Sequence, residues 1–164
     1  LESHGGTPSF LDVTGQVRGA IAASGIGNGI VAVMSPHTTC SVYYDEWAHD
    51  TVEDGSDFLQ HDLNRVLGPD QTRFPPSDGY SYPGTRHFEE VESWPSAEEY
   101  LPGGDRSALL NADAHLKASI VGSSQTFPLI DGELGFGVTG YIFFVDWDRD
   151  RPRTRTCRVT VIGE

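Results

Sequence analysis

Lysine is nearly absent from this chain: Lys117 is the only one, and lysine and arginine together number 11 against 24 aspartates and glutamates. The formal net charge is therefore −13 at pH 7. A surface of that sign repels nucleic-acid phosphates and anionic lipid headgroups, so we expect neither a nucleic acid nor a membrane as partner. No apolar run approaches the roughly 20 residues that a membrane-spanning helix needs.

Cysteine is also scarce, with only Cys40 and Cys157. Two cysteines are too few for a disulfide framework or a structural zinc site, and we expect both to be reduced core residues. The chain does not begin with a basic stretch followed by an apolar one, as a secretion signal does. These features predict a cytoplasmic location.

The length and the pattern of apolar residues predict a single α+β domain over residues 9–164, built on a β-sandwich or mixed sheet. Residues 1–8 are expected to be a disordered or tag-like start. Two or three helices are predicted, over 14–24, 46–67 and 114–121. The β-prone runs predict strands at 10–13, 29–34, 39–44, 125–130, 140–146 and 154–162, with a hairpin turn at Asp131-Gly132. Residues 69–105 are rich in Pro, Gly, Ser and Tyr and predict a long irregular segment, either functional or a plain surface excursion.

The first candidate site residue is His37, in the sequence Ser35-Pro-His37-Thr38-Thr39. Pro36 interrupts the preceding strand, which places His37 at a strand end or bend. The hydroxyls of Thr38 and Thr39 can orient an imidazole or bind a ligand oxygen. The alternative is a histidine that is satisfied by a neighbouring backbone group.

The second candidate is the segment Asn111-Ala-Asp113-Ala-His115-Leu-Lys117. If Asp113 caps a helix, His115 lies in its first turn, where free N–H groups and the helix dipole attract anions. Lys117 adds a positive charge, so a phosphate or carboxylate ligand is one prediction. A metal bound by His115 with Asp113 or another histidine is a second, and a plain cap with a surface lysine is the third.

Two further histidines could join a site. Glu46 and His49 are three residues apart and would share one face of a helix, as metal ligands, as an acid/base pair or as solvated charges. His87 lies in the long irregular segment and could swing into a site.

The last candidate is a basic strip near the C-terminus, since five of the eleven basic residues fall between Arg149 and Arg158. In a strand, Arg151, Arg153 and Arg155 point to one face. Three guanidiniums on one face suit bidentate phosphate contacts. They could equally pair with the interleaved aspartates or with another subunit.

Taken in this order, the segments resemble the YjbQ-like family, whose members are sometimes named secondary thiamine-phosphate synthases. The likeness covers roughly residues 9–163. His37, Glu46, Asn111, Asp113, His115 and Lys117 match the family position by position. The strings that carry the likeness are Gly29-Ile-Val-Ala-Val-Met-Ser-Pro-His37-Thr-Thr, Asn111-Ala-Asp-Ala-His115-Leu-Lys-Ala-Ser-Ile-Val-Gly122, Asp131-Gly-Glu-Leu-Gly135 and Asp146-Trp-Asp followed by Arg-Pro-Arg153.

The resemblance implies an α+β domain assembled as a homotrimer, with a cleft containing both histidines. It implies a divalent metal in that cleft, zinc rather than magnesium, bound by His37 and His115, and we expect His87, or alternatively His49, to replace the third histidine that members carry. It also implies a weak thiamine-phosphate synthase activity, which joins a hydroxymethylpyrimidine diphosphate to a thiazole phosphate. On this interpretation the catalytic residues are His37, Glu46, Asp113 and His115, and the substrate-binding residues are Thr38, Thr39, Asn111, Lys117, Arg151 and Arg153.

Three departures from the family pattern predict a divergent subgroup. Ser107 stands where members carry a further histidine, and Gly137-Val-Thr-Gly140 replaces Gly-Thr-Trp-Gln. The family's Asp-Gly-Pro-Arg becomes the longer Asp148-Arg-Asp-Arg-Pro-Arg153. The alternatives to a synthase are therefore a non-catalytic protein that binds a small anion or metabolite, and a metal-dependent hydrolase.

Overall fold

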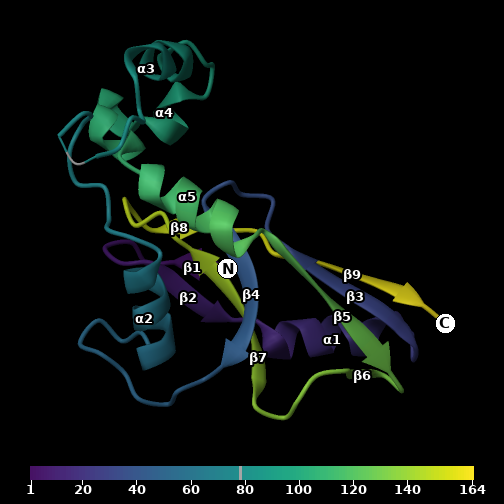
Figure 1. The fold of residues 1–164 in the computed structure, drawn as a ribbon. Helices are drawn as coiled ribbons and strands as arrows, with labels where there is room; N and C mark the ends of the chain where they lie inside the picture. Colours follow the sequence, from purple (N-terminus) through teal and green to yellow (C-terminus); the bar gives the residue numbers. More distant parts are fainter. Residues whose placement is uncertain (78) are drawn as a thin grey trace.

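A computed structural model describes residues 1–77 and 79–164, and it confirms the predicted α+β class (Figure 1). The strands are all paired antiparallel, in one sheet of order β2-β7-β4, one of order β6-β5-β3-β9, and the short pair β1-β8. Their bounds are Glu2–Ser3 (β1), Ser9–Asp12 (β2), Gly29–Met34 (β3), Cys40–Glu46 (β4), Ser124–Ile130 (β5), Glu133–Leu134 (β6), Gly140–Asp146 (β7), Arg153–Thr154 (β8) and Arg158–Gly163 (β9).

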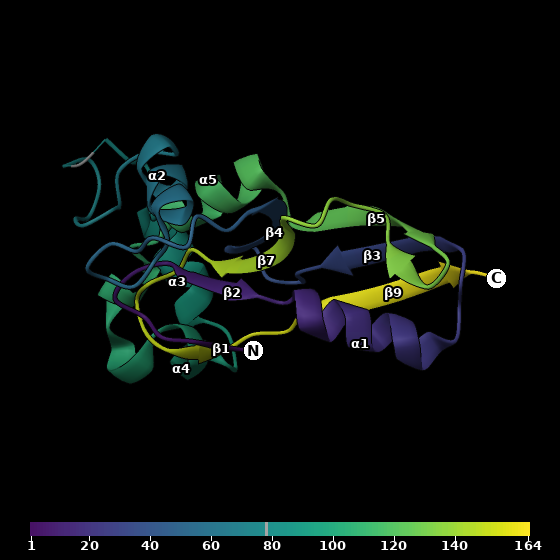
Figure 2. The same cartoon turned by 90° about the horizontal axis from the view of Figure 1, so that it is seen from below.

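The main core lies between the two larger sheets. Alternate residues of β3 and β5 point inward, such as Val31 and Phe127, and they pack in one buried cluster with Val42 of β4 and Phe144 of β7. Helix α1 (Thr14–Ser24) closes this core and runs alongside β9 (Figure 2). It ends at Gly25, as predicted, because that glycine adopts the left-handed conformation (φ 69°).

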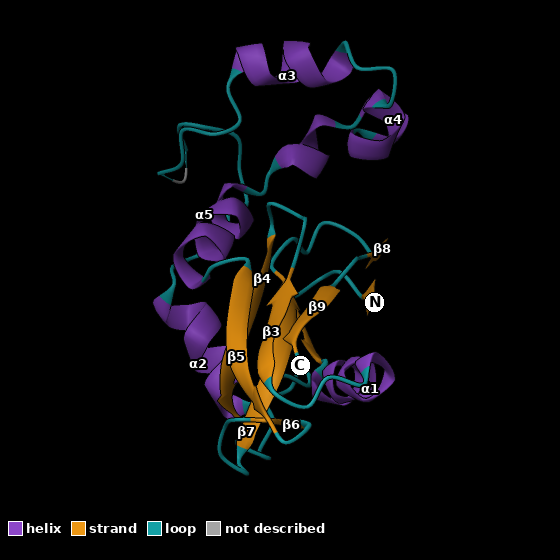
Figure 3. Ribbon diagram, turned by 90° about the vertical axis from the view of Figure 1, so that its right-hand side faces the viewer, coloured by secondary structure: helices purple, strands orange, loops and turns teal. Residues whose placement is uncertain are grey.

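The other face of the β2-β7-β4 sheet is covered by helices. Ala114 and Ala118 of α5 (Ala112–Val121) pack on Phe143 and Val145 of β7, and α2 (Phe58–Val66) packs beside them. Figure 3 shows α2 and α5 on one side of the sheets and α1 on the other. The small alanines let the backbone of α5 approach the sheet closely.

The helix predicted from Glu46 onward is wrong over its first half. Strand β4 continues to Glu46, which pairs with Gly140, and the next eleven residues form a loop. Helix α2 begins only at Phe58, because Asp57 and Gln60 form a reciprocal capping box there. Ladder hydrogen bonds to β7 therefore outweigh the helical pattern of the sequence.

The segment 69–105 contains more regular structure than predicted, which raises the number of helices above two or three. It includes α3 (Thr85–Glu92), α4 (Ala97–Tyr100) and the short 3-10 turn Pro102–Gly104, and a second such turn follows at Arg106–Leu109. These elements have a small core of their own, formed by Phe88, Val91, Leu101 and Leu109. Figure 3 shows them beyond the end of α5, away from the main core.

Residues 1–8, which the sequence predicts to be disordered, lie against the C-terminal part of the chain. Glu2 and Ser3 pair with Thr154 and Arg153 as β1 and β8. The backbone of Leu1 exchanges hydrogen bonds with Arg155. These pairings satisfy the backbone groups that a frayed start would leave to solvent.

Candidate functional site

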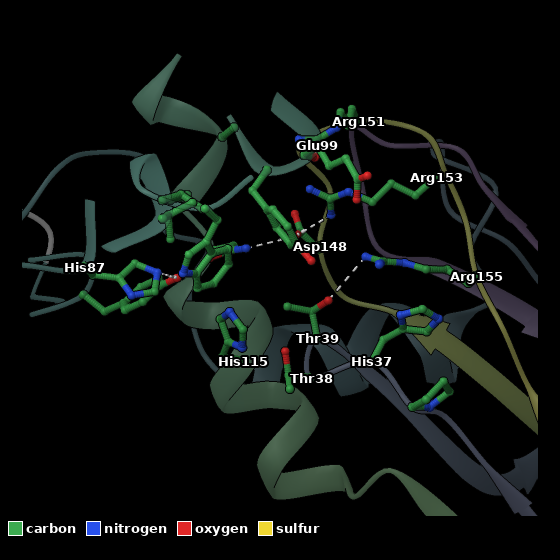
Figure 4. A pocket seen from close by; sticks show the side chains of 18 of the residues that line it. His37, Thr38, Thr39, His87, Glu99, His115, Asp148, Arg151, Arg153 and Arg155 are labelled. Atoms are coloured by element: carbon green, nitrogen blue, oxygen red, sulfur yellow. Dashed lines mark hydrogen bonds and ion pairs between the residues drawn. The ribbon is translucent and has the colours of Figure 1, made fainter. Parts of the chain in front are cut away.

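A cavity of about 740 Å³ opens where the loop after β3, the start of α5, the α3–α4 region and the segment 148–155 meet (Figure 4). The structure brings nine of the candidate residues named from the sequence into its lining. They are His37, Thr38, Thr39, His87, Asn111, His115, Arg151, Arg153 and Arg155.

His37 is held at one side of the cavity by two hydrogen bonds. Its backbone N–H donates to the Ser35 hydroxyl at 3.1 Å, and its Nε2 accepts from the Thr156 backbone N–H at 2.9 Å. The proton of the neutral ring is therefore on Nδ1. Partial burial and the positive charge of Arg155 lower the pKa of His37. His37 is thus a neutral, oriented imidazole rather than a cation.

His115 lies on the face of α5 that points toward Thr38 and Asp148 (Figure 4). Burial lowers its pKa, although the negative charge of Asp148 and a hydrogen bond with the Thr38 backbone oppose that shift. The ring of Tyr82 stands edge-on to it at 5.6 Å between centroids, and the Tyr82 hydroxyl lies 2.9 Å from His87 Nε2. Tyr82 thus connects the two histidines in one wall.

The basic strip forms the opposite wall, and Arg151, Arg153 and Arg155 all line the cavity, although only Arg153 lies in a strand. Their predicted alternative also holds, because each is paired with an aspartate. Arg155 binds buried Asp146 through two hydrogen bonds of 2.7 and 2.9 Å, and Arg153 lies 2.5 Å from Asp148. These ion pairs fix the guanidiniums in place before any ligand arrives.

Arg151 is the least constrained of the three arginines. It pairs with Asp150 and donates to the Glu99 carbonyl of α4. The side chain of Arg151 is 27% exposed, whereas that of Arg155 is 11% exposed. It therefore has donors left for a ligand.

Asp148 connects the two walls, whereas the sequence suggested it only as an ion-pair partner of the arginines. One of its oxygens accepts from Asn111 Nδ2 at 2.9 Å and also contacts Arg153. Burial alone would raise the pKa of this carboxyl, but the charge of Arg153 and the hydrogen bonds from Asn111 and Arg153 outweigh it and hold the pKa below its usual range. Asp148 is therefore an ionised anchor within the lining.

Lys117 and Asp113 do not reach the cavity, which corrects their predicted roles. Lys117 is 1% exposed and its ammonium contacts Asn64, Asp70 and Asp113 at 2.9, 2.8 and 3.5 Å. Residues four apart share a helix face, whereas His115 lies two residues from each and points the opposite way. Lys117 and Asp113 are therefore structural residues on the buried face of α5.

The start of α5 is also not open to anions. Its first residue is Ala112, and the Ala112 N–H donates to the side chain of buried Gln71 at 2.8 Å. Burial raises the pKa of Asp113, against a hydrogen bond from the Gln71 backbone. Gln71 thus occupies the position that the sequence suggested for a ligand.

Glu46 is likewise absent from the lining. It is exposed at the far end of β4, six residues beyond Cys40, and a strand rises roughly 3.3 Å per residue. His49 follows it in a loop with a positive φ of 66°, so the two do not share a helix face. This pair supplies no acid/base chemistry to the cavity.

The predicted three-histidine zinc site does not fit the geometry. His37 Nε2 accepts from a backbone N–H and His87 Nε2 faces the Tyr82 hydroxyl. Across residues 1–77 and 79–164, no group of three His, Cys, Asp or Glu side chains is arranged to hold a metal ion. Metal chemistry therefore has no support from these side chains.

The residues that sequence reasoning missed are mainly aromatic. Trp94 and Tyr100 from the α3–α4 region line the cavity together with Tyr82. The ring centroids of Trp94 and Tyr100 are 5.2 Å apart. The only signal for them is the aromatic content of the long segment 69–105. Their position depends on tertiary folding of α3 and α4, which the sequence pattern does not show.

The chain is similar along its whole length to a group of known proteins. It matches the family described as UPF0047 protein YjbQ-like over residues 2–164. It is 30% identical to a UPF0047 protein of Methanothermobacter thermautotrophicus, covering 94% of this chain and 83% of the relative, and 30% identical to UPF0047 protein YugU of Bacillus subtilis, covering 94% and 89%.

Solved structures agree with this similarity. A YjbQ/UPF0047 family protein from Clostridium acetobutylicum superposes with a TM-score of 0.61 at 27% identity, covering 99% of this chain and 98% of the other. A protein from Aeropyrum pernix superposes with a TM-score of 0.64 at 25% identity, covering 100% and 96%. The chain described here therefore belongs to the YjbQ/UPF0047 family.

Proposed function

We propose that the cavity binds a phosphorylated heterocycle and that the protein is an enzyme acting on it, with thiamine-phosphate synthesis as the specific reaction. One observation carries this proposal: a single cavity has three arginines on one wall and three large aromatic rings on the others. Arginine favours phosphate and aromatic rings favour a planar ligand. A ligand with both parts matches this lining.

The charged wall suits a diphosphate more than a simple anion. Arg155 donates to the Thr39 hydroxyl at 3.3 Å and to Asp146, while Arg151 and Arg153 follow at alternate positions. Because the aspartates already hold the guanidiniums, little side-chain entropy is lost when a ligand binds.

The proposed reaction requires little proton transfer by side chains of the protein. The thiazole nitrogen forms a bond to the pyrimidine methylene carbon while the carbon–oxygen bond to diphosphate breaks, and diphosphate leaves with the electron pair. Charge develops on the leaving group, where Arg151 and Arg153 stabilise it. The attacking nitrogen carries no proton, so the absence of Glu46 and Asp113 from the lining removes no required base. Neutral His37 and His115 then serve to bind and orient the substrates.

A non-catalytic binding protein is the second candidate. It is favoured by the sequence positions at which this chain departs from the family pattern. The departures at Ser107 and Gly137–Gly140 fit a subgroup that keeps the cavity and has lost turnover. The metal-dependent hydrolase has no such supporting observation.

The test is synthesis of thiamine phosphate from the purified pyrimidine diphosphate and thiazole phosphate. We expect product with the wild-type protein, loss of most activity in His37→Ala, and retention in the control His61→Ala, whose ring is exposed on α2. Binding of the pyrimidine diphosphate without product would favour the binding protein. Product formation equal in His37→Ala and wild type would contradict the assignment of the reaction to this cavity.

We also propose that the protein assembles as a homotrimer, as the resemblance to the family implies. The outer face of the β6-β5-β3-β9 sheet supports assembly, because Ile30, Ile130 and Ile162 are 44%, 54% and 59% exposed there. An apolar sheet face of this kind is more stable when it is covered.

The cytoplasmic location stays a prediction. No helix within residues 1–77 and 79–164 is both long and apolar enough to cross a membrane.

A further inference from the structure

Asn111 carries a hydrogen-bond acceptor that none of the described residues uses. The residue is 8% exposed and lines the cavity at the start of α5. Its Oδ1 atom is buried and has no hydrogen-bond partner among the described residues. Buried polar atoms are nearly always paired, so this oxygen points to a donor from outside residues 1–77 and 79–164.

The orientation of the Asn111 amide follows from its neighbour. Nδ2 lies 2.9 Å from an Asp148 oxygen. An ionised carboxylate only accepts hydrogen bonds, so the amide nitrogen must face Asp148 and the oxygen must face away from it. The unused atom is therefore an acceptor, and its complement is an N–H or O–H donor.

Asp148 also determines how far the ligand's donor group lies from its anionic group. The same carboxylate oxygen that accepts from Asn111 contacts a guanidinium nitrogen of Arg153 at 2.5 Å. The Asn111 amide and the Arg153 guanidinium are thus held side by side. A ligand whose anionic group binds the arginines presents its adjoining ring to Asn111.

We propose that Asn111 determines specificity by accepting a hydrogen bond from an amino or hydroxyl group on the ligand ring, so that the ligand is an anionic aromatic compound with such a donor. The inference rests on the proposed function, because it assumes that the arginine wall binds a phosphate. A donor on the ligand ring pairs with Oδ1, whereas an apolar substituent at the same place leaves this buried acceptor without a hydrogen bond.

The experiment compares three matched pairs of small probes by titration calorimetry. Each pair is an aminophenyl phosphate and the corresponding methylphenyl phosphate, with the substituent ortho, meta or para to the phosphate. Amino and methyl groups are similar in size, and only the amino group donates. Scanning the three positions finds the spacing between Arg153 and Asn111 that the cavity sets.

We expect the amino compound of at least one pair to bind wild-type protein at least fivefold more tightly than its methyl partner, the lower end of the penalty for an unsatisfied buried acceptor. In Asn111→Ala, and in Asn111→Ser as a second variant should the first fold poorly, this ratio should fall to about one. The control Asn28→Ala, at the opposite end of β3, should keep the wild-type ratio.

The outcomes separate the two proposals. Equal binding of amino and methyl compounds in all three pairs, or a ratio that survives in both Asn111 variants, overturns the role of Asn111 and leaves the phosphate site intact. If none of the six compounds binds and the pyrimidine diphosphate does not bind either, the proposed function fails, and this inference fails with it.

Discussion

The site depends on a few residues whose charges are neutralised inside the protein. Asp146 is fully buried, and it accepts hydrogen bonds from Arg155, from the Asp148 backbone and from the Cys40 thiol. Burial and the nearby Asp146 charge raise the pKa of Cys40 to about 12, so that this cysteine is an inert core residue at neutral pH. Arg155 is the one cationic side chain that contacts Asp146 within the described residues.

Removal of Arg155 should therefore destabilise the protein. We expect Arg155→Met to lower the free energy of unfolding by about 3 kcal/mol or more, since it leaves a buried carboxylate without its counter-charge. Urea denaturation followed by circular dichroism measures this change. The control Arg65→Met breaks the exposed pair with Asp62 and should cost about 0.5 kcal/mol or less. Similar losses in the two variants would contradict the structural role of Arg155.

The resemblance to the family predicted the convergence of His37, His115 and the arginines better than residue patterns predicted the roles of single residues. Strand ends and alternation along a strand bring such side chains to one place without detailed packing. Asp148 and Asn111 could not be paired in advance, because their contact depends on the path of the chain after β7. Contacts of this kind come from tertiary structure alone.

At the scale of elements, helical periodicity explains why His115 lines the cavity and Lys117 does not. The sequence grouped them because they are two residues apart, but that spacing turns them to opposite faces of α5. Lys117 instead joins α5 to α2 and to the start of the segment 69–105, through Asn64 and Asp70. The periodicity itself could have excluded Lys117 from the site.

The single lysine offers a direct test of this arrangement. We expect Lys117 to resist acylation by an N-hydroxysuccinimide ester in the folded protein, because its ammonium is enclosed and paired. Peptide mass spectrometry should detect the modified lysine only after denaturation, and the denatured sample is the positive control. Rapid modification of the folded chain at Lys117 would show that this face of α5 is open.

The region of α3 and α4 was the least predictable part of the fold. Its helices are short, at eight and four residues, and its apolar core is separate from the two main clusters. Short helices depend on tertiary packing rather than on propensity, so the sequence pattern between residues 69 and 105 carried little signal. The aromatic wall of the cavity was lost from the prediction for that reason.

At the scale of the whole molecule, the two cavity histidines couple stability to pH. Both have a pKa below the ordinary value of 6.5, chiefly because of burial. At a pH between the folded-state and unfolded-state pKa values, the unfolded chain binds more protons than the folded chain. The contribution of the two histidines to the free energy of unfolding is therefore fully present above pH 6.5. It is lost as the pH falls through their folded-state pKa values.

We expect the free energy of unfolding to decrease from pH 7.5 to pH 5.5, by at most about 1.4 kcal/mol per pH unit for each histidine. Urea titrations at the two pH values measure the decrease, and His115→Gln should make it smaller. If the decrease is the same in His115→Gln as in the wild type, His115 is not held neutral by its surroundings.

The proposed assembly is tested by mass in solution. Light scattering should give three times the 17.9 kDa of one chain. Ile162→Asp, which places a charge on the exposed apolar sheet face, should shift the mass toward that of one chain. The control Ile120→Asp alters an exposed isoleucine of α5, 67% accessible, and should leave the mass unchanged. A wild-type mass near 17.9 kDa would contradict the trimer.

The central claim is that the arginine and aromatic walls form a binding site for a phosphorylated heterocycle. Calorimetric titration of the pyrimidine diphosphate into wild type, Arg151→Gln and Arg65→Gln tests it most directly, because Arg151 is the most exposed of the three cavity arginines and Arg65 is exposed on α2. We predict saturable binding that weakens about tenfold or more in Arg151→Gln, the usual contribution of a charge-assisted hydrogen bond, with no change in Arg65→Gln. Equal affinity in all three proteins, or no binding to any of them, would contradict the account.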